Sequence, residues 1–108
     1  ISNNFIEGAY SHGIGITPVD TTIIGNSVRY CGKHGIYLYG GQQTSIIGNT
    51  SVYNGQLEGY TGYDIYIAEG AIKRVWRCNI SNNASYVTVN TTSNFNDVIV
   101  ANNLNTKG

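Results

Sequence analysis

The chain carries little charge: 11% of its 108 residues are Asp, Glu, Lys or Arg, and the formal net charge is zero. Nucleic-acid recognition needs clustered Lys and Arg, and so does a polybasic attachment to a membrane surface. We therefore expect neither nucleic acid nor a membrane among its partners. Low charge does not indicate disorder here, because Val, Ile and Tyr are plentiful and regularly placed, which makes a packed core available.

Long apolar runs are missing as well, and no basic segment followed by an apolar one opens the chain. The sequence therefore shows neither a membrane-spanning helix nor a secretion signal. Met is absent, and residue 1 already lies inside a repeat. We expect a single segment, residues 1–108, that is a fragment of a longer protein, with its first and last coils incomplete.

Cysteine is scarce too, with only Cys31 and Cys78. Their spacing fits no metal-binding pattern, and they fall at different places in the repeat, Cys31 aligned with Asn54 and Cys78 with Gly48. A disulfide between them stays open, while two free, buried thiols that act as small apolar residues are favoured.

What the chain does contain is a short internal repeat. The segment 12–16 matches the segment 34–38 at an offset of 22, and Thr22–Asn26 recurs as Ser45–Asn49 at an offset of 23. Each repeat begins with four residues in which the second and fourth are apolar, which is typical of a half-buried strand. The inward residues should be Ile14 and Ile16, Ile36 and Leu38, Ile65 and Ile67, and Val87 and Val89.

A second strand follows in each repeat, over residues 22–24, 44–47, 73–77 and 97–100, and it ends at an Asn. Asn tolerates the left-handed backbone of a sharp corner, and identical amides on stacked strands form ladders. The predicted corner residues are Asn4, Asn26, Asn49, Asn79 and Asn102, with Asn103 as the alternative to the last. A third strand after the Asn should place Ile6, Val28 and Val52 inward.

Three short strands per repeat predict an all-β fold, a right-handed parallel β-helix (solenoid) of about four coils with an Asn-rich turn. The repeats Gly-Ile-x-Leu and Ile-Ile-Gly-Asn resemble those of the pectate-lyase-like superfamily over nearly the whole chain. The resemblance implies an extracellular, cell-surface or virion protein that binds or cuts polysaccharides, as lyases, hydrolases, epimerases and phage tail spikes do.

One repeat is longer than the others. The third begins 29 residues after the second, and the excess lies in residues 55–62. Insertions in solenoids map to loops on one face, which is often the binding face, although a tolerated surface insertion is equally compatible. Outward Tyr side chains of the first strands lie nearby. We expect sugar contacts from Tyr37, Tyr39, Glu58, Tyr60, Tyr66 and Trp76.

A complete active centre is not apparent. Hydrolases of the superfamily use paired Asp residues, and the lyases use an Arg or Lys base with acidic Ca²⁺ ligands, and neither set is present. If catalysis occurs within this segment, we expect His34 as acid/base and Asp64 as its partner one coil on. We expect no cofactor, although the resemblance leaves Ca²⁺ open, and no metal site.

Two functions remain open from the sequence. The first is a segment that binds or processes polysaccharide, with the remaining coils of a parent chain beside it. The second is a structural segment of a tail spike or adhesin that assembles into a homo-oligomer, a trimer by resemblance, since unpaired strand edges invite other chains.

Overall fold

The computed structural model describes residues 1–68, 75–85, 87–90 and 99–103. In this part of the chain every regular element is a β-strand, and every strand pair is parallel. The prediction of an all-β, parallel architecture is confirmed. Period-two alternation with frequent Ile, Val and Tyr explains why these segments form strands and why Gly and Asn separate them.

The described strands form three four-stranded sheets and one short pair. The β1 sheet contains β1 (Phe5–Glu7), β4 (Ser27–Arg29), β8 (Thr50–Val52) and β12 (Ala84–Ser85). The β2 sheet contains β2 (Ile14–Ile16), β5 (Ile36–Tyr39), β9 (Ile65–Ala68) and β13 (Val87–Asn90). The β3 sheet contains β3 (Thr22–Ile24), β7 (Ser45–Ile47), β11 (Asn79–Ser81) and β14 (Ile99–Ala101), and β6 (Gly41–Gln42) pairs with β10 (Val75–Trp76).

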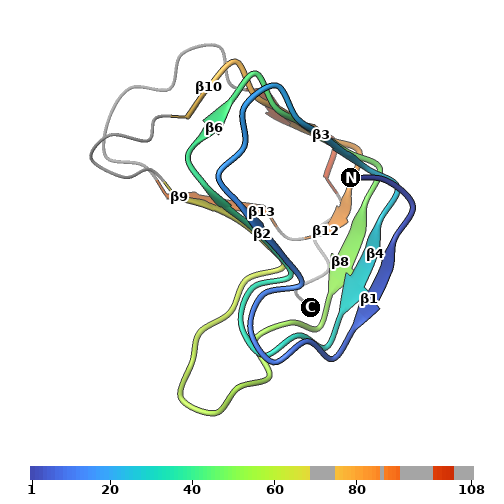
Figure 1. Ribbon diagram of the computed structural model, residues 1–108, viewed down its shortest axis with the longest axis vertical. Helices are drawn as coiled ribbons and strands as arrows, with labels where there is room; N and C mark the ends of the chain where they lie inside the picture. Colours follow the sequence, from blue (N-terminus) through green and yellow to red (C-terminus); the bar gives the residue numbers. More distant parts are fainter. Residues whose placement is uncertain (69–74, 86, 91–98, 104–108) are drawn as a thin grey trace.

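The chain visits the three sheets in the same order in every repeat, and successive repeats lie over one another (Figure 1). The apolar residues of all three sheets meet inside. Stacks of residues from successive coils form this core, such as Ile36 on Ile65 and Ile46 on Ile80. Its fully enclosed members are Ile23, Val28, Ile36, Leu38, Ile46, Ile65, Ile67 and Ile80. The parallel sheets and the shared core are compatible with a β-helix-like solenoid.

One corner of each coil is built from two residues of fixed roles. The first has a left-handed backbone, with φ between 54° and 69°, and is Asn3, Gly25, Gly48, Asn82 or Asn102. The second is an Asn, and from one coil to the next the backbone N–H and the Nδ2 of this Asn donate to the Oδ1 of its counterpart. This Asn ladder consists of Asn4, Asn26, Asn49, Asn83 and Asn103.

The structure corrects two of the predicted corner residues. Asn79 begins β11, where it pairs with Ser45, and Asn83 takes the ladder position of that coil. Asn102 is the left-handed residue (φ 56°), and Asn103 is the ladder member. The predicted second strand over 73–77 is also wrong, since residues 75–76 form β10 beside β6, and β11 follows at residue 79.

The strand register also corrects two smaller predictions. Cys78 precedes Asn79 and therefore aligns with Thr44, not with Gly48. Val28 pairs with Ser51, which is buried, while Val52 pairs with Arg29 and is only half-buried. Ser51 can take an inward position because its Oγ donates a 2.6 Å hydrogen bond to the backbone oxygen of Asp64, which offsets the cost of burying a hydroxyl. Both Cys are buried thiols.

Candidate functional site

The inserted loop, residues 55–62, returns to its starting point through a narrow neck. The Gly55 amide donates hydrogen bonds to the backbone oxygens of Cys31 (2.9 Å) and Lys33 (2.8 Å). Gly62 packs directly against Gly55, so closely that a Cβ at Gly62 would overlap Gly55 and the Lys33 backbone oxygen. The loop is therefore anchored at its base, and from there it projects from the body of the coils (Figure 1).

Beside the loop, the outer face of the β2 sheet carries a stack of rings. The strand register aligns Gly15, Tyr37 and Tyr66, and the side chains that precede the strands insert between them. His12 lies on Tyr37 (ring centroids 4.6 Å apart), and His34 lies on Tyr66 (4.5 Å). Neighbouring rings are parallel to within 20°. We call this set the aromatic ladder: His12, His34, Tyr37, Tyr63 and Tyr66.

The two imidazoles of the ladder are held by backbone hydrogen bonds of the following coil. His12 Nδ1 accepts from the His34 amide (3.2 Å), and His34 Nδ1 accepts from the Tyr63 amide (2.9 Å). His34 Nε2 lies 3.1 Å from the hydroxyl of Tyr60, on the inserted loop. Both nitrogens of the buried His34 ring are thus engaged by the protein itself.

Burial also governs the charge of these rings. It is the main cause that lowers the pKa of His34 to about 4, with smaller contributions from His12 and the Lys33 ammonium. Burial likewise lowers the pKa of His12 and raises the pKa of Tyr37, whose neighbours include Tyr66. His12, His34 and Tyr37 are therefore uncharged near neutral pH and act as neutral hydrogen-bonding groups.

A depression of about 320 Å³ lies between the ladder and the inserted loop. Its walls are His12, His34, Tyr37, Tyr60, Thr61, Tyr63 and Tyr66. The Tyr60 ring crosses the plane of His34 at 64°, and so it does not join the stack. A neighbouring open hollow of about 390 Å³ includes Tyr37 and Tyr39. Aromatic edges and hydroxyls in a concave surface suit a polar, partly apolar ligand.

The structure brings together only part of the predicted site. Tyr37, Tyr60, Tyr66 and His34 line the depression, and Tyr39 lies in the hollow beside it. Asp64 instead accepts a 3.1 Å hydrogen bond from Asn54 Nδ2. Glu58 lies in the turn at the exposed tip of the loop and outside the depression's walls.

Trp76, a predicted sugar contact, lies in β10 with its backbone, and its side chain lies outside what the structure describes. Thr61 was not predicted and lines the depression together with Tyr60 of the same loop. Its place inside the insertion is the signal that singles it out.

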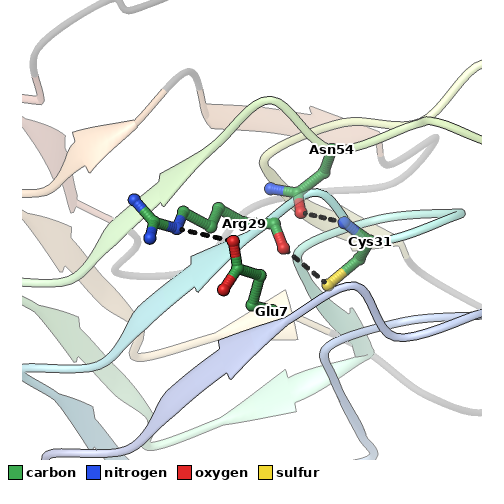
Figure 2. A network of polar contacts seen from close by, with 4 residues as sticks. All are labelled: Glu7, Arg29, Cys31 and Asn54. Atoms are coloured by element: carbon green, nitrogen blue, oxygen red, sulfur yellow. Dashed lines mark hydrogen bonds and ion pairs between the residues drawn. The ribbon is translucent and has the colours of Figure 1, made fainter.

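A different corner of the molecule carries a second group of rings. Tyr30 and Tyr53 stack (centroids 5.6 Å apart), and the Arg29 guanidinium lies over Phe5 and Tyr30. Glu7 and Arg29 form an ion pair beside these rings, with 3.4 Å between Arg29 Nε and Glu7 Oε1 (Figure 2). Figure 2 also shows Asn54 Oδ1 accepting from the Cys31 amide (3.0 Å), so the corner after the β1 sheet has its own side-chain support.

Among the described residues, no three His, Cys, Asp or Glu side chains gather closely enough to hold a metal ion. The same part of the chain contains no helix long and apolar enough to cross a membrane. Comparisons with protein-family models, with curated proteins and with solved structures found no match.

Proposed function

We propose that this chain is a segment of a right-handed parallel β-helix that binds a polysaccharide in the depression between the aromatic ladder and the inserted loop. The parallel sheets, visited in the same order in every repeat, support the solenoid. The right-handedness of parallel crossovers supports its hand. The resemblance of the repeats to the pectate-lyase-like superfamily supports a secreted, surface or virion location.

The observation that carries the proposal is the depression itself. Its walls include Tyr37 and Tyr66 from the ladder and Tyr60 and Thr61 from the loop. The faces of the ladder rings pack on one another, which leaves their edges and hydroxyls for a sugar. Tyr60 stands outside the stack, at 64° to the His34 ring. A sugar ring has both apolar C–H faces and many hydroxyls, and such a surface suits both.

The geometry supports binding more than catalysis. A general acid/base needs a nitrogen or oxygen free to exchange a proton with the substrate. Both nitrogens of His34 are engaged, and a pKa of about 4 leaves it a weak base. Asp64 is bonded to Asn54. We propose that any chemistry on the polysaccharide takes place on other coils of a parent chain.

The experiment is a calorimetric titration with two probes, cellohexaose as a neutral hexasaccharide and hexagalacturonate as an acidic one. Tyr37→Ala removes a wall of the depression and should weaken binding roughly tenfold or more. Tyr53→Ala is the matched control, because Tyr53 is also a stacked Tyr but lies on Tyr30, outside the depression. Binding of neither probe, or equal losses in both variants, would count against the proposal.

A second candidate function is assembly into a homo-oligomer. It is favoured by the exposed rings that gather near the β1 sheet, where Phe5, Tyr30 and Tyr53 are 60%, 44% and 63% exposed. Adjacent exposed rings are typical of an interface. Sedimentation of the protein at increasing concentration tests it. A trimer that dissociates in the Tyr53→Ser variant would favour assembly, and a monomer throughout would exclude it.

A further inference from the structure

The hydrogen bonds around His34 determine which atom carries its proton. A backbone N–H can only donate, so His34 Nδ1, 2.9 Å from the Tyr63 amide, must be the acceptor. A neutral imidazole then carries its single proton on Nε2. The 3.1 Å contact with Tyr60 is therefore a hydrogen bond from His34 Nε2–H to the Tyr60 oxygen.

The surroundings keep this ring neutral. The His34 side chain is 4% exposed, and its pKa is lowered to about 4, first by burial and then by His12 and Lys33. The other titratable groups against the ring are the phenols of Tyr37, Tyr60, Tyr63 and Tyr66. A second proton on Nδ1 would also oppose the Tyr63 N–H. The Nε2–H form is thus the one that fits its neighbours.

The direction of this bond has a consequence for Tyr60. Its oxygen already accepts from His34, so its own hydrogen points elsewhere, and no described residue accepts it. Tyr60 lines the depression, where a ligand could accept that hydrogen. The Lys33 ammonium, 5.3 Å from the centre of the Tyr60 ring, draws electron density from it. A hydroxyl that accepts one hydrogen bond also becomes a stronger donor for the next.

We propose that Tyr60 is the specificity-determining hydrogen-bond donor of the depression, with His34 as the residue that positions it. The ligand must then place an acceptor oxygen against Tyr60, either an uncharged oxygen of the sugar chain or a carboxylate. This inference rests on the proposed function for its ligand, and on the protein alone for the polarity of the bond.

The first arm of the test needs no ligand. Nitrogen chemical shifts of ¹⁵N-labelled histidine in the whole chain at pH 7 report which nitrogen of each ring is protonated. His34 should show a protonated Nε2 and a bare Nδ1, and the pattern should persist until the pH approaches 4. A protonated Nδ1 at pH 7 would overturn the inference, whatever the protein binds.

The second arm measures the affinities for cellohexaose and hexagalacturonate. Tyr60→Phe removes the donor and keeps the ring, so binding should weaken roughly fivefold. His34→Asn should have a similar effect, because an Asn amide can still accept from the Tyr63 amide but does not reach Tyr60. The double variant should bind about as well as either single one, since both changes remove the same interaction.

Tyr53→Phe is the control and should leave both affinities unchanged, because Tyr53 lies on the other corner. Preference for the neutral probe identifies an uncharged sugar oxygen as the acceptor, and preference for the acidic probe identifies a carboxylate. Full affinity in Tyr60→Phe, or strictly additive losses in the double variant, would overturn the inference. If neither probe binds, the proposed function fails, and the nitrogen shifts alone decide the polarity of the His34–Tyr60 bond.

Discussion

Single amide side chains hold one corner of this molecule together. Asn49 is 1% exposed and uses all of its polar atoms, since its Oδ1 accepts from Asn26 and its Nδ2 donates to Asn83 Oδ1 and to the Ile23 oxygen. Each bond crosses from one coil to another. A buried amide in such a chain is costly to remove, because its former partners remain buried and unpaired.

We expect Asn49→Ala to lower the free energy of unfolding by about 3 kcal/mol, since several buried groups lose their partners. Urea unfolding measures this loss. The control is Asn82→Gly, a change at the neighbouring left-handed position (φ 55°), where Gly stands in two other coils. It should alter stability by less than about 0.5 kcal/mol. A loss as large as that of Asn49→Ala would show that the corner needs Asn at both places.

His34 should make stability depend on pH. The unfolded imidazole has a pKa near 6.5 and the folded one a pKa of about 4, so between these values the unfolded chain binds more protons. Stability should therefore be full above pH 6.5 and fall as the pH is lowered towards 4. His12, whose pKa is lowered too, acts in the same direction.

Urea unfolding at a series of pH values between 7 and 4 checks this dependence. The decrease should be smaller in His34→Asn, which keeps an acceptor for the Tyr63 amide and cannot titrate. An identical pH profile in the variant and the parent protein would place the dependence in other groups.

Among the structural elements, the inserted loop is the one that makes the outer face of the β2 sheet part of a concave site. Without residues 55–62 the aromatic ladder would be an open surface, and Tyr60 and Thr61 would be absent from it. The loop is held at its neck by Gly55 and Gly62, and at its outer part by the contact between Tyr60 and His34.

We expect Gly62→Ala to open this neck, since the new Cβ would meet backbone atoms of Gly55 and Lys33 that cannot move independently. Amide exchange at Gly55 and Leu57 should accelerate by at least about tenfold, because their hydrogen bonds to the 31–33 segment weaken. In Gly59→Ala the new Cβ meets no atom within 4 Å, and the strain of an Ala at φ 78° falls on the outer part of the loop, away from the neck. That control should leave exchange at the neck unchanged, and faster exchange in both variants would mean that the neck is not the anchor.

At the scale of the whole molecule, stability comes from stacks of apolar side chains that pass through successive coils. Ile23, Ile46 and Ile80 form one such stack, and each is almost completely enclosed. Because each coil contacts chiefly its neighbours, a defect in a middle coil weakens two interfaces at once.

We expect Ile46→Ala, in the middle of its stack, to cost about 3 kcal/mol through lost burial and the cavity it leaves. Ile24→Ala is the matched control on the outer face, where the side chain is 42% exposed, and it should cost less than about 1 kcal/mol. The two losses in the free energy of unfolding are compared through the urea midpoints, provided that the m-values are unchanged. Equal losses would contradict the assignment of the core.

Much of this architecture could be predicted from local patterns. Alternation predicted the strands of the β2 sheet, and the repeats predicted Asn4, Asn26 and Asn49 at one corner. Asn79 was misplaced because alternation does not say how many residues separate two strands. The pairs Asn3-Asn4, Asn82-Asn83 and Asn102-Asn103 share the corner pattern, and that pattern identifies Asn83 and Asn103.

The sequence alone determined the features that depend on near neighbours: short strands, sharp corners and the column of outward Tyr residues. Only the tertiary structure decided the features that depend on contacts between coils. It set the register that buries Ser51 in place of Val52, and it brought Tyr60 to His34, 26 residues away. The physical reason is that these positions follow from how whole coils pack and how a loop closes, which no single segment encodes.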